Sequence, residues 1–393
     1  MTATLKQLSS EINEAGWLLY YDVSPLFEEH WTGISVAAAG LARAMLGWMP
    51  ESCRFFYEHT MVPREAVEDA IDRGSGLFLA RGFFQGRAQM GPLSLLDESR
   101  LAAGIYPSVK RVTQLFPIEC SIYHDISTLI TPQFHIMENI RHHITGLVDD
   151  LRTNAITFGV SVATVEDLRA YLGADERRTF VAPNGVSWPW WYPIQAENEL
   201  DLGRIEPYFL VLGTREPRKN VSRVLEMLTI FPEALDSARF VIAGRRGWLQ
   251  DDQSIPPAIA TAIEEQRILF PGFVSDFEKY KLLRGAVATI YPSFFEGFGL
   301  PVLESLSVGT PCIASFSSSI PEVGGDACVY FDPFSAESLY AAVQHVQGAG
   351  LKQQPEFLSA CRALTERFTW DNMLERILVP LVEELRNHRR QTC

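Results

Sequence analysis

The stretch that decides the fold is ATIYPSFFEGFGLPVLESLSVGTPCIAS, residues 288–315. Its first residues are apolar and partly β-branched, and they predict a buried strand over 288–291. Two glycines follow Glu296, and the next segment predicts a helix over 301–307 that begins at a proline. A second apolar run predicts another strand over 311–314. A strand, a glycine loop, a helix and a strand form the parallel unit of an α/β protein.

The same alternation continues on both sides of this stretch. In the carboxyl-terminal half we expect strands at 208–212, 240–243, 268–270 and 328–331, with helices at 223–229, 256–266, 277–284 and 336–347. In the amino-terminal half we expect strands at 17–23, 118–124, 154–160 and 179–182, with helices at 36–45, 132–152 and 165–172. Strands that alternate with helices in this way predict doubly wound parallel sheets.

A change of composition separates the two halves. Residues 187–193 are SWPWWYP, and a polar, acidic stretch follows them. Proline and bulky aromatic residues do not continue a helix, so this segment predicts a linker. We therefore expect an amino-terminal domain over 1–186, a linker over 187–206, a second domain over 207–370 and a final helix over 371–393.

Composition excludes several classes of protein. The 393 residues carry a formal net charge of −14, which argues against general nucleic-acid binding. Six cysteines occur without a CxxC pair, which is typical of reduced thiols. The first residues lack the apolar core of a signal peptide, and no apolar run is long enough to span a membrane. We expect a cytoplasmic protein, and peripheral contact with the inner face of the membrane stays open.

Glu296 and Glu304 flank a loop that suits a phosphate. Gly297 and Gly299 allow the backbone to approach a ligand closely, and the free N–H groups at the start of the next helix attract an anion. Carboxylates do not bind phosphate, so the two glutamates suit the hydroxyls of a sugar and of a ribose. The alternative is an ordinary strand–loop–helix turn with two solvated glutamates.

A basic loop follows the strand expected at 208–212. Residues 213–220 are GTREPRKN and contain Arg215, Arg218 and Lys219. Cations at the carboxyl end of a strand can neutralise a diphosphate leaving group, although a solvated basic turn is the alternative. Because no Asp-x-Asp pair occurs in the sequence, we expect no metal ion and no cofactor.

Two positions in the amino-terminal half are weaker candidates. His124 ends an expected strand and would face the ligand-binding edge of its sheet, although a lone histidine is more often structural. Gly33 follows the first expected strand in a loop that many folds contain.

Together these motifs resemble a known family. YFLVLGTREPRKN, FVIAG, FPGFVSD and the stretch quoted first are similar to the carboxyl-terminal half of family 4 glycosyltransferases. HDISTLITPQFH and VAPNGV extend a weaker resemblance through the amino-terminal half, and RFTWDNMLERI resembles the last helix of the family, which returns to the first domain. The resemblance implies an α/β fold of the GT-B type, with two Rossmann-like domains facing across a cleft.

The resemblance also implies a function. A hexose would pass from a nucleotide diphosphate sugar to a glycan or lipid-linked glycan acceptor, with retention of the anomeric configuration, in surface polysaccharide assembly. The TREPRKN form of the basic loop resembles mannosyltransferases, so GDP-mannose is the first expected donor and UDP-hexose the second. Glu296 would hold the sugar, with His124 near it, and Glu304 would hold the ribose. The remaining donor contacts would come from Arg218, Lys219, the backbone of Gly297, Phe298, Gly299 and Leu300, and the base-contacting position Val274.

Two positions depart from the pattern of the family. Many members carry arginine where this chain has Thr214, which leaves Arg215 or Arg218 to substitute. Many also carry arginine where this chain has Val36. Two other functions stay open, namely a nucleotide-sugar epimerase of the same fold and a catalytically degenerate scaffold subunit. The presence of both glutamates and Lys219 favours an active enzyme.

Overall fold

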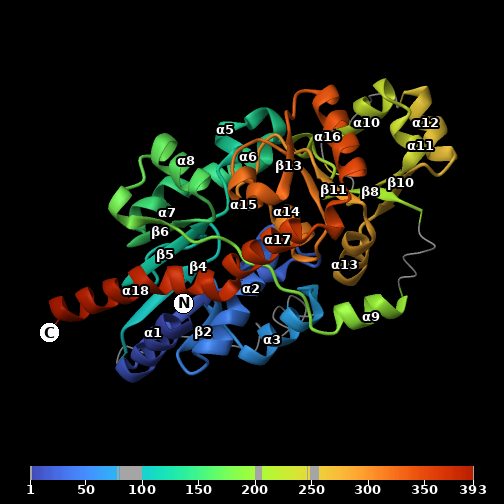
Figure 1. Cartoon of the computed structure of the whole chain (residues 1–393). Helices are drawn as coiled ribbons and strands as arrows, with labels where there is room; N and C mark the ends of the chain where they lie inside the picture. The colour runs from blue at the N-terminus through green and yellow to red at the C-terminus, as the bar shows by residue number, and fades with distance from the viewer. Residues whose placement is uncertain are drawn as a thin grey trace. The chain divides into compact units, whose positions relative to one another are not determined.

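The chain forms two compact units, which we describe from a computed structural model (Figure 1). The structure describes residues 2–77, 79, 100–199, 206–245, 247 and 256–392. The first unit comprises residues 1–126, 141–187 and 368–393, and the second comprises 127–140 and 188–367. Residues 127–140 thus lie with the second unit, whereas the sequence placed them in the first domain. One reason is that Phe134 stacks on Phe294, with ring centroids 5.1 Å apart.

The first unit is built on a seven-stranded sheet in the order β3-β2-β1-β4-β5-β6-β7. Its pairs are parallel except for β2 with β3. The strands are β1 (Leu18–Asp22), β2 (Cys53–Tyr57), β3 (Thr60–Val62), β4 (Ala102–Tyr106), β5 (Ile118–Tyr123), β6 (Ile156–Gly159) and β7 (Thr179–Val181). Every residue of β1, β4 and β5 is buried, as expected for central strands covered on both faces.

Helices cover this sheet. They are α1 (Thr2–Ala15), α2 (Gly33–Trp48), α3 (Arg64–Arg73), α7 (Leu147–Thr153), α8 (Val162–Leu172) and α18 (Trp370–Thr392). The carboxyl-terminal α18 packs against α1 and α2, the helices nearest the other end of the chain (Figure 1).

The prediction of one long helix over 132–152 is wrong. The structure has a 3₁₀ turn (Pro132–Phe134), α6 (Met137–Ile144) and α7 in its place, together with the short α5 (Ser127–Ile130) before them. The physical cause of the last break is Gly146, whose φ of +90° is incompatible with a continuing helix.

The second unit contains a six-stranded, fully parallel sheet in the order β10-β9-β8-β11-β12-β13. Its strands are β8 (Tyr208–Leu212), β9 (Arg239–Ala243), β10 (Ile268–Gly272), β11 (Ala288–Tyr291), β12 (Cys312–Ser315) and β13 (Cys328–Phe331). In addition to α5, its helices are α9 (Tyr192–Glu199), α10 (Val221–Ile230), α11 (Ala234–Ser237), α12 (Pro257–Glu264), α13 (Asp276–Gly285), α14 (Leu300–Ser307), α15 (Ile320–Gly324), α16 (Ala336–Ala349) and α17 (Pro355–Arg367).

The core of the second unit lies on both faces of this sheet. Alternate residues of β8 point to opposite faces, so Phe209 packs in the cluster that α10 and α16 cover, and Leu210 packs in the cluster beside α13. This two-sided burial explains why β8 appears in the sequence as a continuous apolar run.

The segment expected to be a linker contains the helix α9, which was not predicted. Pro193 occupies its first turn, where a proline costs no hydrogen bond. Trp188 and Tyr192 pack against Tyr280 of α13, with ring centroids 5.2 and 5.5 Å away, so aromatic contacts hold this segment within the second unit. Residues 200–205 of the expected linker lie outside the described residues.

Two other expectations concern the whole chain. Within the described ranges no helix is both long and apolar enough to cross a membrane. The five cysteines that the structure describes are unpaired and buried, as expected for reduced thiols, and Cys393 lies outside those residues.

Both sheets reverse their strand order once near the middle. In the first unit the reversal lies between β1 and β4, and in the second between β8 and β11. Open α/β sheets bind ligands at the carboxyl ends of the strands that flank such a switch point. The two motifs singled out in the second unit follow β8 and β11, so the topology places both at this position.

Candidate active site

The basic loop after β8 is held by Asn220. This residue adopts a left-handed conformation, with φ of +53°, and is buried. Its side-chain amide donates hydrogen bonds to the carbonyls of Pro292 and Pro333, each at 3.0 Å. Asn220 therefore fixes the end of the basic loop to the loop that follows β11. We had not predicted a role for Asn220, although its place directly after the cations was a usable signal.

The beginning of the basic loop packs closely against the loop that follows β9, and this packing requires a glycine there. A Cβ atom at Gly244, which follows β9, would lie 1.9 Å from the carbonyl oxygen of Gly213. The φ of Gly244 is +145°, so a side chain at this position would be strained even without the clash. This close approach allows the amide of Arg215 to donate a 2.8 Å hydrogen bond to the carbonyl of Arg245.

Glu296 is the centre of a cluster of charged side chains. Its Oε1 lies 2.7 Å from Nζ of Lys219, and its Oε2 lies 2.9 Å from a guanidinium nitrogen of Arg218. Lys219 also donates a 3.2 Å hydrogen bond to the hydroxyl of Tyr291. Burial by itself would raise the pKa of Glu296, but Arg218 and Lys219 outweigh it and lower that pKa to about 2. Glu296 is therefore an ionised acceptor at every physiological pH.

Serines hold the backbone around Glu296. The Glu296 amide donates to Oγ of Ser318 at 2.9 Å, and Oγ of Ser319 donates to the Glu296 carbonyl at 2.8 Å. Gly299 has a φ of +101° and precedes the first turn of α14, which gives the turn that the sequence predicted. Gly297, Phe298 and Leu300 lie on the same loop and at the start of the same helix.

Arg215 and Arg218 differ in how many hydrogen bonds their guanidinium groups make within the protein. The Arg218 guanidinium bonds Glu216 at 2.8 Å and the carbonyl of Phe295 at 2.7 Å, in addition to Glu296. The Arg215 guanidinium lies 5.0 Å above the ring of Phe270, and its buried Nε has no hydrogen-bond partner among the described residues. The Arg218 guanidinium is thus already bonded to three protein acceptors, whereas the Arg215 guanidinium makes no hydrogen bond within the described residues, so Arg215 is the better replacement for the arginine absent at Thr214.

Glu304 forms a separate ion pair. It lies on α14, is 8% exposed, and accepts a 2.7 Å hydrogen bond from Nζ of Lys279 on α13. Burial alone would lower the pKa of Lys279, but the charges of Glu304 and Asp276 raise it above its usual value. Lys279 was not predicted, and we find no signal for it in the sequence pattern of α13.

Val274 follows β10, where the sequence places the contact with the base. Its side chain packs against the cluster that contains Leu210 and Leu283. This packing uses the side chain, so a contact with a base would come from the backbone.

In the first unit, His124 follows β5 and its ring is fixed by the loop after β4. Its Nε2 lies 2.9 Å from the carbonyl oxygen of Pro107. A carbonyl only accepts, so Nε2 carries the proton and Nδ1 is left as an acceptor. Burial lowers the pKa of His124, which keeps the ring neutral near pH 7.

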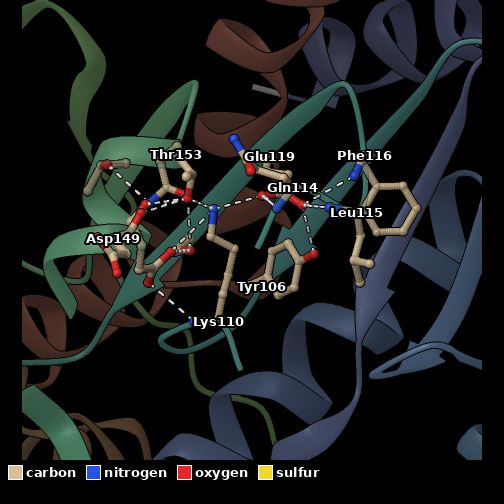
Figure 2. A network of polar contacts seen from close by, with 12 residues as sticks. Tyr106, Lys110, Gln114, Leu115, Phe116, Glu119, Asp149 and Thr153 are labelled. Atoms are coloured by element: carbon tan, nitrogen blue, oxygen red, sulfur yellow. Dashed lines mark hydrogen bonds and ion pairs between the residues drawn. The ribbon is translucent and has the colours of Figure 1, made fainter. Parts of the chain in front are cut away.

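The loop that holds His124 contains a buried polar network (Figure 2). Residues 107–117 join the parallel strands β4 and β5 without a helix, so their backbone groups need other partners. The Glu119 carboxylate accepts hydrogen bonds from three of these amides, those of Gln114, Leu115 and Phe116, at 2.9, 2.7 and 3.2 Å. Lys110 binds the same carboxylate at 2.8 Å and lies 3.4 Å from Asp150. These contacts replace the helix that such a connection usually contains.

Gly33 begins α2, and a carboxylate occupies the first turn of that helix. Glu28 accepts hydrogen bonds from Thr32 at 3.2 Å and Ser35 at 2.6 Å. An acidic side chain at this end stabilises the helix dipole. It also disfavours a phosphate at the same position, in line with the absence of arginine at Val36.

Comparisons with known proteins bear on the second unit most directly. Residues 196–347 match the sequence model of the family described as "Glycosyl transferases group 1". The chain is 28% identical over 258 residues to O-antigen chain mannosyltransferase B of Escherichia coli, which covers 64% of this chain and 66% of that protein. It is 26% identical over 172 residues to O-antigen chain mannosyltransferase RfbU of Salmonella typhimurium, covering 44% and 46%. The aligned part thus spans just under two thirds of the first relative and less than half of the second. The resemblance to glycosyltransferases is confirmed.

Solved structures bear on the fold of the whole chain. Sucrose-phosphate synthase from Thermosynechococcus elongatus is similar with a TM-score of 0.63 at 16% identity, over 95% of this chain and all of that one. At this identity the likeness concerns the fold alone. The expected α/β fold of the GT-B type is confirmed.

Proposed function

We propose that this chain, whose residues 196–347 form a group 1 glycosyl transferase domain, is a glycosyltransferase that moves a hexose from a nucleotide diphosphate sugar to a glycan acceptor. The observation that carries the proposal is the convergence of Lys219, Arg218 and Glu296 at the β8/β11 switch point. Cations suit a diphosphate, and an ionised carboxylate suits sugar hydroxyls. Their contact supports a single site that binds both the diphosphate and the sugar.

The cations would stabilise the departing nucleotide diphosphate. As the bond between the anomeric carbon and the phosphate oxygen breaks, negative charge collects on the β-phosphate, and a fixed ammonium or guanidinium lowers the energy of that state. Arg215, whose guanidinium makes no hydrogen bond within the described residues, and Lys219 are the residues we assign to this charge. Since these side chains supply the positive charge, we propose that the reaction needs no metal ion.

Glu296 would position the sugar rather than attack it. Two cations share its negative charge, and a pKa of about 2 makes the carboxylate a weak nucleophile. We propose that the acceptor oxygen attacks the anomeric carbon on the face from which the diphosphate leaves, and that its proton passes to the departing phosphate. Configuration is then retained without a covalent intermediate. His124, neutral and with Nδ1 as an acceptor, is assigned to the same sugar.

Mannose is the favoured sugar, and GDP-mannose the first donor to test. The relatives named above are O-antigen chain mannosyltransferases, which supports this choice and an acceptor that is a glycan or lipid-linked glycan of a surface polysaccharide. We propose that the protein works in the cytoplasm, at the inner face of the membrane that holds such acceptors.

A panel of nucleotide sugars tests the proposal. Thermal shift and slow donor hydrolysis should single out one nucleotide sugar, with GDP-mannose expected to give the largest shift and UDP-hexoses the next. The released sugar and nucleotide identify the reaction, whereas conversion of the donor into an isomer without release would indicate an epimerase. Binding and hydrolysis should persist in excess EDTA. If no member of the panel is bound or turned over, the proposal of an active transferase is refuted.

A further inference from the structure

Lys279 is a largely buried charged residue of the second unit that the proposed mechanism does not use. It lies on α13, three residues after Asp276, and its Nζ lies 2.7 Å from Oε1 of Glu304 and 3.3 Å from Asp276. The pair with Glu304 joins two helices, α13 and α14, because the residues are 25 positions apart in the chain. It differs from the exposed pairs of neighbouring residues that occur along surface helices.

The lysine is held in place on its other side by Trp188. Its ammonium lies 5.3 Å from the centre of the Trp188 ring, a distance at which a cation is attracted to an aromatic face. The indole N–H of Trp188 donates a 2.8 Å hydrogen bond to Oγ of Ser307, which donates in turn to the carbonyl of Glu304 at 2.7 Å. The same aromatic residue thus orders both the cation and the helical turn that carries its carboxylate.

The contacts leave one oxygen of Glu304 available. Among the described residues, the carboxylate is bonded through Oε1 alone. To accept hydrogen bonds from a ribose, this carboxylate must present its other oxygen in a fixed direction. A cation on Oε1 meets this requirement, because it restricts rotation of the side chain.

We infer that Lys279 is a positioning residue for ribose recognition, which holds Oε1 of Glu304 so that Oε2 accepts the ribose hydroxyls. This inference rests on the proposed function, which assigns the ribose to Glu304. Lys279 itself contacts neither the ribose nor the diphosphate. Its removal should therefore abolish the preference for a ribose over a sugar without hydroxyls and leave the rest of nucleotide binding intact.

Calorimetric titration of the full chain tests this inference. The probes are GDP, UDP and their 2′,3′-dideoxy forms, and the proteins are the wild type, Lys279→Met and the control Lys281→Met. Lys281 lies on the same helix and pairs with the exposed Glu199 instead of Glu304. Lys279→Gln serves as a second neutral variant, and thermal unfolding verifies that each variant is folded.

The wild type is expected to bind the better nucleotide about tenfold more tightly than its dideoxy form, the range for hydrogen bonds to a charged group. In Lys279→Met this ratio should fall to about twofold or less, because only the ribose form loses affinity. Lys281→Met should keep the wild-type ratio.

Three results would overturn the inference. The first is a wild-type ratio in both neutral variants of Lys279. The second is equal weakening of the ribose and dideoxy forms, which would mean that Lys279 attracts the diphosphate. The third is tighter GDP or UDP binding in Lys279→Met, which would mean that the lysine competes with the ribose. If the wild type binds neither nucleotide, the proposed function itself fails and the inference falls with it.

Discussion

Each unit of the protein contains a lysine paired with a buried carboxylate, and the two pairs differ in what surrounds them. In the first unit, Lys110 is fully buried, with Glu119 and Asp150 beside it. In the second, Lys219 is 17% exposed and Arg218 13% exposed, and both bind Glu296. The first cluster fills the connection between two strands, whereas the second lies at the carboxyl ends of two strands.

The two clusters differ in how far their cations are exposed to solvent and in how many neutral protein groups surround their carboxylates. Both carboxylate oxygens of Glu119 bind protein groups, including three backbone amides and the hydroxyl of Tyr106. Asp150 likewise accepts from Ser121 and Tyr123, each at 2.8 Å. In the second unit, by contrast, the charged groups face one another and stay partly open to solvent. A saturated cluster holds a fold together, and a partly open cluster at a switch point is suited to a ligand.

The largest expected effect is on stability, from Lys110→Met. This change leaves two buried carboxylates without their cation and should lower the free energy of unfolding by about 3–5 kcal/mol. Urea denaturation measures it, and nucleotide affinity of the folded variant should not change. Arg64→Met is the matched control, because Arg64 pairs with Glu68 on an exposed helix surface and its loss should cost less than about 1 kcal/mol. Equal stability of the two variants would show that the Lys110 network does not hold the connection.

The next effect distinguishes the role of Glu296 from that of Glu304. Glu296→Gln keeps the size of the side chain and should lower kcat by about a hundredfold to a thousandfold, if its contacts tighten in the transition state. Free GDP or UDP lacks the sugar and should bind this variant nearly as well as the wild type. Glu304→Gln, by contrast, should also weaken the binding of free GDP or UDP. The reverse pattern of calorimetric and kinetic results would exchange the two assignments.

A third effect follows from the pKa of Glu296. Its pKa of about 2 in the folded protein lies below the ordinary value of 4.5, so the ion pairs of Glu296 add stability that is fully present above pH 4.5 and is lost as the pH falls towards 2. The shift corresponds to about 3 kcal/mol at neutral pH. The midpoint of thermal unfolding should therefore fall more steeply in the wild type than in Glu296→Gln between pH 5 and pH 3. Parallel curves would contradict the ion-pair geometry.

The smallest effect is expected from Lys219→Ala. Because Lys219 is partly exposed and Arg218 still holds Glu296, unfolding should change little. Nucleotide diphosphate affinity should fall by about 1.5–3 kcal/mol, the range for a charged hydrogen bond. The comparison between the two units is sharpened if Lys110→Met loses stability and Lys219→Ala loses affinity. An unchanged dissociation constant for both GDP and UDP would remove Lys219 from the site.

The sequence by itself determined the elements whose signals are local. The apolar run of β8, the glycines after Glu296 and the cations of residues 213–220 lie within short windows, and the alternation of strands and helices implied their order in a parallel sheet. The same signals were sufficient for the family resemblance and for most of the candidate donor site. The single helix expected over 132–152 was wrong because the left-handed Gly146 separates α6 from α7, and the helix α9 within the expected linker was missed because aromatic contacts of Trp188 and Tyr192 hold that segment.

Only the tertiary structure decided which side chains meet. Lys219 and Glu296 are 77 residues apart, and they pair because β8 and β11 are neighbours in the sheet. The pairing of Lys279 with Glu304 likewise depends on how α13 packs beside α14. Periodicity along a chain reports which face of an element is buried. It carries no information on which distant residue completes a charge pair, because that choice is made by the packing of whole elements.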